Sequence, residues 1–204
     1  RPARQGNMPA PARNGKNGQM TGSLMPIRDI QVAELTLQDI KDFICPDAND
    51  SEAFMFLKLC QARNLNPFTR EAYLIKYGGK ANMIVGKEAF TRKAEMHPQF
   101  DGFRAGVVLA NGDQIEGSLL IDGQVLAGGW AEVYRKDRKC HFKAVVALKE
   151  YSKSQATWKD MPATMIRKVA IVSALREAFP SDLAGCYTND ELGIDPDREV
   201  VGNA

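Results

Sequence analysis

The chain has 204 residues, of which 44% are hydrophobic and 25% are charged, and its formal net charge at pH 7 is +2. This composition is that of a globular protein with room for one domain or two small ones. Because no apolar run approaches the roughly 18 residues of a membrane span and the N-terminus lacks a signal-peptide core, we expect a cytoplasmic protein with no membrane partner.

The two ends of the chain differ in composition from the middle. Residues 1–28 are rich in Gly, Pro, Asn, Arg and Gln and carry five cations and no acid, which predicts a disordered basic tail. From residue 188 onward the chain is acidic and interrupted by Gly and Pro, which predicts an acidic tail over residues 188–204. The folded core is therefore expected over residues 29–187.

Two helices are expected at the start of this core. Thr36 and Asp39 have the spacing of a capping box, followed by apolar residues and by Pro46 as a stop. Asp50 or Ser51 is expected to cap a second helix, which ends at Asn64. Its apolar residues cover more than one stripe, which predicts burial on two sides.

Short strands dominate the middle of the core. Residues 73–77 and 83–85 flank a Gly-Gly pair and predict a β-hairpin, and a short helix is expected over residues 87–95. Further strands are expected over residues 103–109, 114–121, 125–135 and 141–151. Short turns separate these strands, so we expect an antiparallel β-meander.

A long helix is expected to close the core, from Pro162 to Phe179, with Pro180 as its stop. Apolar residues spread around most of its circumference, so little of the helix is free to face water. The expected fold class is α+β: N-terminal helices, a β-hairpin and an antiparallel β-meander, followed by a long basic and apolar C-terminal helix.

The spacing of the candidate residues excludes several common kinds of binding site. A phosphate loop around Lys87 fails because Ala81 stands where Gly is required and Glu88 where Ser or Thr is required. The four cysteines and two histidines have neither zinc-site nor disulfide-framework spacing, which predicts reduced, structural cysteines. We therefore expect no cofactor and no ATP.

Positive charge is concentrated late in the core. Residues 134–176 carry eleven Lys and Arg against three Asp and Glu, a net charge of +8, with aromatic residues interleaved. Such a block is typical of single-stranded nucleic acid binding, where cations hold phosphates and rings stack on bases; the alternative is a solvated basic face. Trp158 either contacts a base or covers the core.

Helix geometry limits how the closing helix can use its cations. Arg167 and Arg176 lie about 180° apart around the helix, whereas Lys168 and Arg176 lie about 80° apart. At least one of the three must therefore serve a different strand, a neighbouring subunit or an internal carboxylate.

Two alternatives remain open at this point. A Mg²⁺-dependent nuclease would use Asp137 and Glu150 with Lys153, although the spacing of Glu150 and Lys153 puts them on opposite faces of a strand. A passive single-strand coating protein would bind DNA without pairing it, and the basic block fits that function equally well.

Four motifs give the chain a resemblance to the RecT/Bet (Redβ-type) phage single-strand annealing proteins. Their order and approximate spacing also match, over about residues 36–190. The motifs are Asn-Leu-Asn-Pro-Phe-Thr-Arg-Glu-Ala-Tyr at 64–73, Gln-Phe-Asp-Gly at 99–102, Val-Tyr-Arg-Lys-Asp-Arg at 133–138, and Trp158 with Pro162 and Met-Ile-Arg at 165–167 running into Ala-Leu-Arg-Glu-Ala-Phe at 174–179.

The resemblance implies a non-catalytic recombinase encoded by a phage or prophage and acting in the bacterial cytoplasm. It would bind single-stranded DNA and the annealed duplex intermediate without ATP, as a ring or helical filament, with Mg²⁺ at most aiding annealing from outside any protein site. A phage exonuclease and the host single-strand binding protein are expected partners, through C-terminal residues truncated at Ala204. The motifs and the basic block together give the expected DNA-binding residues: Arg70, Lys87, Arg135, Lys136, Arg138, Lys153, Trp158, Lys159, Arg167, Lys168 and Arg176.

Overall fold

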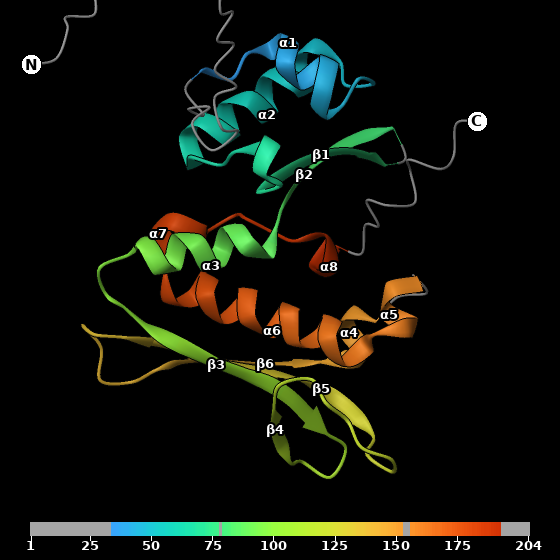
Figure 1. The fold of residues 1–204 in the computed structure, drawn as a ribbon, viewed down its shortest axis with the longest axis vertical. Coiled ribbons are helices and arrows are strands. Elements are labelled where there is room, and N and C mark those ends of the chain that lie inside the picture. The colour runs from blue at the N-terminus through green and yellow to red at the C-terminus, as the bar shows by residue number, and fades with distance from the viewer. Residues whose placement is uncertain (1–33, 78, 153–155, 193–204) are drawn as a thin grey trace, which may run out of the picture.

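A computed structural model describes residues 34–77, 79–152 and 156–192. The chain forms two lobes that meet at Gly86 (Figure 1). The first lobe, residues 34–85, contains α1 (Leu37–Asp39), a π-helical turn η3 (Ile40–Ile44), α2 (Asp50–Arg63), a 3₁₀ turn η4 (Pro67–Thr69), and the strands β1 (Ala72–Tyr77) and β2 (Lys80–Val85). Within the described residues, no helix is both long enough and apolar enough to cross a membrane.

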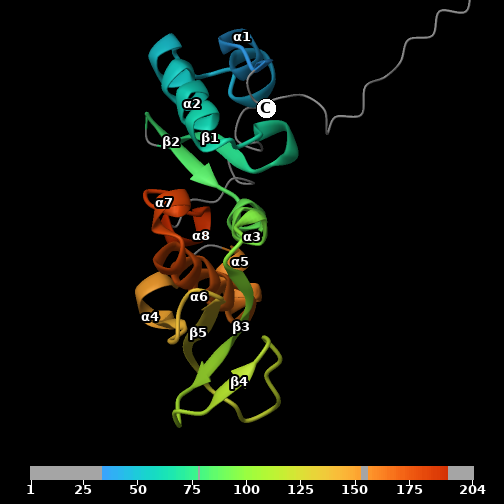
Figure 2. The same ribbon diagram turned by 90° about the vertical axis from the view of Figure 1, so that its left-hand side faces the viewer.

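The second lobe, residues 86–192, is a sheet covered by helices. Its elements are α3 (Lys87–Met96), β3 (Phe100–Leu109), β4 (Gln114–Glu116), β5 (Leu126–Arg135), β6 (Phe142–Ala147), α4 (Leu148–Tyr151), α5 (Ala156–Asp160), α6 (Pro162–Ala178), α7 (Pro180–Leu183) and α8 (Asn189–Leu192). Figure 2 shows α3 between the β1–β2 hairpin and α6, with the sheet beyond α6. The mixed helix and antiparallel sheet confirm the α+β fold class.

Local sequence signals set the ends of the helices. The Thr36 and Asp39 capping box is present, and Asn64 ends α2 in the left-handed conformation with φ 47°. The cap of α2 is Asn49, whose side chain accepts from the amide of Glu52 at 2.9 Å. The predicted cap at Asp50 or Ser51 is therefore wrong, because Asp50 is already the first residue of the helix. A capping box again satisfies the first amides of the helix.

The expected meander is wrong in its strand order. The second-lobe sheet is antiparallel with the order β4-β3-β5-β6, so β3 pairs with both β4 and β5. β4 has only three residues and ends at Glu116, whereas β5 is as long as β3 and pairs along it from Phe100 to Leu109. The longer β3–β5 ladder therefore lies in the middle of the sheet, and β4 is a short edge strand. The last expected strand also ends early, at Ala147, and continues as α4.

The sheet and α6 form the main core. Ten residues of α6 are buried, and the helix lies so close to β5 that a Cβ on Gly129 would sit 2.6 Å from the carbonyl oxygen of Ile166. That distance is too short for any side chain at Gly129, so this glycine permits the packing of α6 on the sheet.

α2 is buried on one side only, which corrects the expectation of burial on two sides. Phe56 and Cys60 lie in the core, whereas Phe54, Met55 and Leu59 are 49%, 59% and 37% exposed. Met55 and Leu59 also line a hollow between α2 and the β1–β2 hairpin. The first lobe therefore presents a connected apolar surface to its surroundings.

Candidate nucleic-acid interface

The basic residues expected to bind DNA do not form one block in space. Among the described residues, Arg70 and Lys87 lie where the two lobes meet, and Arg167 and Lys168 lie on α6. Arg135, Lys136 and Arg138 lie at the end of β5 and in the turn after it, Trp158 and Lys159 lie on α5, and Arg176 lies near the end of α6. We call Arg70, Lys87, Arg167 and Lys168 the junction cluster. Lys153 lies outside the described residues.

Arg70 and Lys87 are brought together by the backbone at the junction. Arg70 is exposed and ends η4 with φ 60°, and the amide of Gly86 donates to the carbonyl of the next residue, Glu71, at 3.0 Å. A Cβ on Gly86 would lie 2.7 Å from the carbonyl oxygen of Arg70. Because Gly86 caps α3, the chain at Arg70 abuts the start of the helix that carries Lys87.

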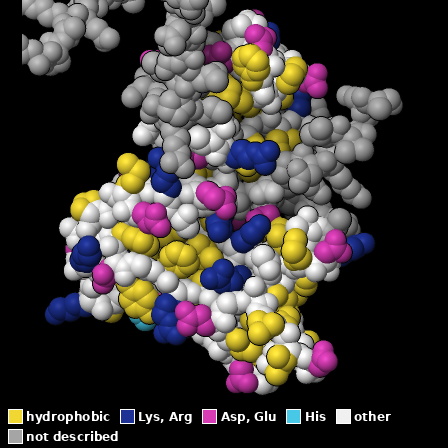
Figure 3. All heavy atoms as spheres, in the orientation of Figure 1, with side chains coloured by type: hydrophobic (Ala, Val, Ile, Leu, Met, Phe, Trp, Pro, Cys, Tyr) yellow, Lys and Arg dark blue, Asp and Glu magenta, His cyan; other side chains and the backbone are white. Residues whose placement is uncertain are grey.

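Lys168 approaches the same region from α6, which packs against both α3 and α8, whereas Arg167 on the same helix contacts β3. Glu88, beside Lys87, and Lys168 both act on the pKa of Asp190 in α8, so these charges face one another. Figure 3 shows Lys and Arg side chains gathering over α6 between α3 and α8. The junction cluster thus draws on three elements that are far apart in the sequence.

Arg167 is held in place by its own contacts. Its Nε donates to the carbonyl of Ala105 on β3 at 3.2 Å, and its charge helps to lower the pKa of Glu116 after the larger effect of Arg104. The side chain is half-buried, and its hydrogen bond holds the guanidinium against β3.

Arg135, which is expected to bind DNA, makes several contacts inside the fold. Its guanidinium forms two 2.8 Å bonds to Asp137, donates to the carbonyl of Ala178 at 2.5 Å and lies 5.0 Å from the ring centre of Phe179. A cation at the C-terminal end of α6 also interacts favourably with the helix dipole. Arg135, with 13% of its side chain exposed, therefore links β5 to the end of α6. Lys136 and Arg138, in the turn that follows, are exposed.

Arg176 is also committed to an internal contact. Its Nε donates to the carbonyl of Cys186 at 3.1 Å, its Nη2 pairs with Glu191, and its guanidinium lies 4.6 Å from the ring centre of Tyr187. The helix geometry predicted that at least one of the three α6 cations does not point into a shared groove. Arg176 is such a cation, because it pairs with an internal carboxylate. Its assignment to DNA stays a prediction that these internal contacts do not support.

Trp158 covers the core. It is 1% exposed and packs in a cluster with Val107, Met165, Ile166 and Val169. A nucleobase cannot stack on a ring that is enclosed on all sides, so this burial favours the alternative in which Trp158 covers the core. Lys159, the next residue, is exposed.

The expected acidic tail begins too early. Thr188 and Asp190 are 2% and 7% exposed, and the carbonyl of Tyr187 accepts from the amide of Val85 at 2.9 Å. Burial raises the pKa of Asp190, the largest of several effects on it. Residues 186–192, which we call the C-terminal strap, therefore belong to the folded core and bridge β2 and α6. The remainder of the expected tail lies outside the described residues.

The sequence reasoning missed one further group of charged residues. Glu71 is 9% exposed, and its carboxylate oxygen lies 2.6 Å from Nε of Arg92 on α3. The two residues are 21 positions apart on different elements, so no periodicity connects them. The signal available was an acid placed directly after an expected DNA-binding arginine.

The nuclease alternative gains no support from the geometry. Arg135 binds both oxygens of Asp137 and lowers its pKa, and Glu150 is exposed on α4. Among residues 34–77, 79–152 and 156–192, no three His, Cys, Asp or Glu side chains gather as metal ligands would.

Comparison with known proteins places the chain in a family. A model of the RecT family matches residues 31–202, which includes both lobes, the junction cluster and the C-terminal strap. The chain is also 34% identical over 175 residues to "Uncharacterized protein UU154" of Ureaplasma parvum serovar 3 (strain ATCC 700970), covering 82% of this chain and 72% of that protein. The family match over most of the chain agrees with the four ordered motifs, and we conclude that this protein belongs to the RecT family.

Proposed function

We propose that this protein binds single-stranded DNA and anneals complementary strands during phage recombination, without ATP and as an oligomeric ring or helical filament. Membership of the RecT family supports single-strand annealing in recombination. The observation that supports the proposal for this chain is the junction cluster: Arg70 and Lys87 lie together at the boundary between the two lobes, and α6, which carries Arg167 and Lys168, packs against α3.

The chemistry of the cluster suits a phosphate chain better than a specific base sequence. Lys and Arg hold phosphates through charge, whereas sequence is read by groups that contact base edges. A protein that anneals strands must leave base edges free for pairing, and cations along a backbone achieve this. We assign the phosphate contacts first to Arg70, Lys87, Arg167 and Lys168.

The exposed cations outside the cluster are a second set of proposed contacts. Lys136 and Arg138 lie in the β5–β6 turn, and Lys159 lies on α5. Because they are separated from the junction, we assign them to the same strand further along its path or to the second strand. Lys153 stays in this set as a prediction.

The apolar surface of α2 supports the proposed assembly. Phe54, Met55 and Leu59 are exposed together on one helix, and larger exposed apolar patches mark sites where proteins associate. A repeated head-to-tail contact gives a ring if its rotation closes and a helical filament if it does not. We also propose a phage exonuclease and the host single-strand binding protein as partners, as the resemblance implies.

An annealing assay tests the proposal against its alternatives. Complementary dye-labelled oligonucleotides are mixed with protein in buffer that contains EDTA and no nucleotide. We expect pairing much faster than the spontaneous rate and binding that weakens steeply with salt, with a slope of about −0.7 per phosphate neutralised. Saturable binding without faster pairing would identify a passive coating protein, and shortened DNA on addition of Mg²⁺ would identify a nuclease.

A further inference from the structure

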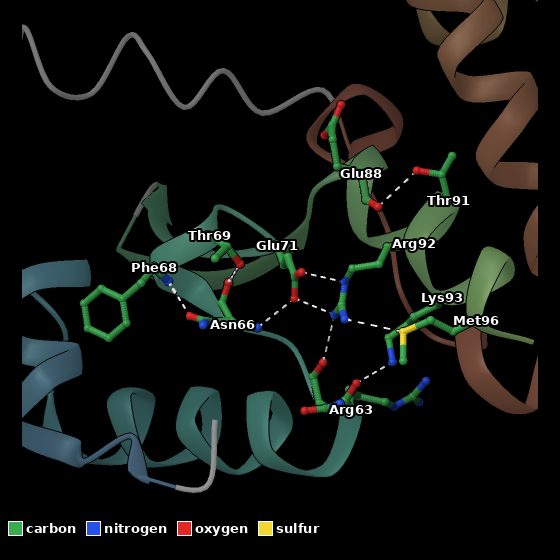
Figure 4. A network of polar contacts seen from close by, with 11 residues as sticks. Arg63, Asn66, Phe68, Thr69, Glu71, Glu88, Thr91, Arg92, Lys93 and Met96 are labelled. Carbon is green, nitrogen blue, oxygen red and sulfur yellow. Dashed lines mark hydrogen bonds and ion pairs between the residues drawn. The ribbon is translucent and has the colours of Figure 1, made fainter. Parts of the chain in front are cut away.

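A partly buried ion pair joins the two lobes beside the junction cluster. The carboxylate of Glu71 lies 2.6 Å from Nε of Arg92 and accepts from its Nη2 at 2.7 Å, one contact to each carboxylate oxygen. Figure 4 shows the guanidinium reaching from α3 to Glu71 in this two-pronged arrangement. The Nη2 contact is a charge-assisted hydrogen bond, which is stronger than a neutral one, and the Nε contact is an ion-pair contact without hydrogen-bond geometry.

The same network also holds the loop between α2 and β1. The amide of Asn66 donates to Glu71 at 2.9 Å, Arg92 Nη2 donates to the carbonyl of Asn64 at 3.2 Å, and Lys93 donates to the carbonyl of Arg63 (Figure 4). α3 therefore grips the end of α2, the loop and the start of β1 at once. The first lobe cannot rotate on α3 without breaking several of these bonds.

Arg70 is placed by this network without being part of it. It stands directly before Glu71, in the left-handed conformation that non-glycine residues seldom adopt, and its carbonyl abuts Gly86. Such a conformation persists where the surrounding structure over-determines it. The surroundings here are Glu71, anchored by Arg92, and Gly86, which leads into Lys87.

We propose that Glu71 and Arg92 are positioning residues, which lock the first lobe onto α3 so that Arg70 stays aligned with Lys87 and the α6 cations on one phosphate path. This inference rests on the proposed function and adds residues that act on DNA through their neighbours. Removing the lock leaves all four cations present but no longer aligned, so one phosphate contact is lost.

Replacing Glu71 distinguishes a positioning role from a simple electrostatic effect, because the two predict changes in DNA affinity of opposite sign. Arg92 has 38% of its side chain exposed, so weaker binding after its substitution would also fit a direct DNA contact. Glu71→Gln removes a negative charge, which by electrostatics alone strengthens binding to a polyanion. The positioning role predicts the opposite, because the lock is broken.

The experiment compares oligonucleotide binding by full-length wild type, Glu71→Gln and Glu88→Gln across a range of salt concentrations. Glu88 is a matched control, because it is a 78% exposed carboxylate beside Lys87 whose removal changes the charge by the same amount. We expect Glu88→Gln to bind as well as wild type or better. We expect Glu71→Gln to bind about tenfold more weakly, with a salt slope shallower by about 0.7, the value of one phosphate.

Gly86→Ala keeps the inference falsifiable if Glu71→Gln unfolds, as judged by circular dichroism. The added Cβ crowds the Arg70 carbonyl at 2.7 Å and displaces Arg70 without changing any charge, so the same shallower slope is expected. Glu71→Gln binding as tightly as Glu88→Gln, or folded Gly86→Ala with the wild-type slope, would overturn the positioning role. Wild type that does not bind single strands would instead overturn the proposed function.

Discussion

Arg176 of α6 is ion-paired with Glu191 of α8, a residue from the segment whose composition predicted a free acidic tail. The pair is well enclosed, with 21% of the Arg176 side chain and 7% of the Glu191 side chain exposed. Glu191 also accepts from the amide and hydroxyl of Thr188. This one carboxylate therefore holds the C-terminal strap against the helix that closes the core.

Breaking that pair is expected to loosen the strap and destabilise the fold. Glu191→Gln leaves Arg176 without a charged partner in a partly buried site, which costs about 1–3 kcal/mol. For a domain of this size that lowers the unfolding midpoint by several degrees. Thermal unfolding followed by circular dichroism measures it, with Glu177→Gln, an exposed acid on α6, as the control. Equal midpoints for the two variants would show that the pair contributes nothing.

Asp190, the neighbouring acid of the strap, is expected to destabilise the fold at neutral pH, the opposite of what is expected for Glu191, and its effect depends on pH. Burial raises its pKa in the folded protein, with the attraction of Lys168 a smaller opposing effect. A raised folded pKa stabilises the fold below the unfolded pKa, and this contribution is lost as pH rises through the folded pKa.

Asp190→Asn should therefore unfold at a higher temperature than wild type at pH 7. The difference should shrink towards zero below about pH 4, where even an exposed aspartate is protonated. Unfolding midpoints of both proteins across this pH range check the prediction. A destabilised Asn variant at pH 7 would mean that attraction to Lys168 outweighs the cost of burial.

Trp158 separates core packing from base stacking. Because the ring is enclosed, Trp158→Phe should leave oligonucleotide affinity within about twofold, whereas loss of one stacked base costs about 1–3 kcal/mol. Trp158→Ala should instead cost about 3–5 kcal/mol in stability, from the cavity that it leaves. Fluorescence anisotropy and denaturant unfolding measure the two effects. A tenfold loss of affinity in a stable Phe variant would return Trp158 to the DNA interface.

The exposed apolar residues of α2 should control assembly. Phe54→Lys combined with Met55→Lys places two charges in the apolar surface without disturbing the buried side of the helix. We expect smaller particles in light scattering, both alone and with oligonucleotide, and an unchanged unfolding midpoint. Lys58→Gln, on an exposed position of the same helix, is the control. Particle sizes equal to wild type would move the subunit contact elsewhere.

Local signals predicted most of the elements, because their causes lie within a few residues. The Thr36 capping box, the left-handed Asn64 and the proline at the start of α6 each act on their own turn. The order of β3, β4 and β5 was not predictable in this way, because it depends on which ladder is longer once the strands meet.

The site was predicted only in part for a similar reason. Residue type and motif predicted Arg70, Lys87, Arg167, Lys168, Arg135 and Arg176 alike as DNA-binding residues, because all six look the same in sequence. In the structure Arg135 pairs with Asp137 and Arg176 pairs with Glu191, and neither contact was predicted from the motifs. Glu191 lies 15 positions beyond its partner, in a segment whose composition predicted no structure.

The most direct measurement is the salt dependence of single-strand binding by a variant in which all four junction-cluster cations are replaced by Gln. In a control, Lys41 on η3 and Lys58 on α2 are replaced together by Gln. We predict a slope shallower than wild type by about 2.8, from four phosphate contacts of about 0.7 each, together with loss of annealing, while the control stays near wild type. A folded fourfold variant that keeps the wild-type slope and still anneals complementary strands would contradict the account.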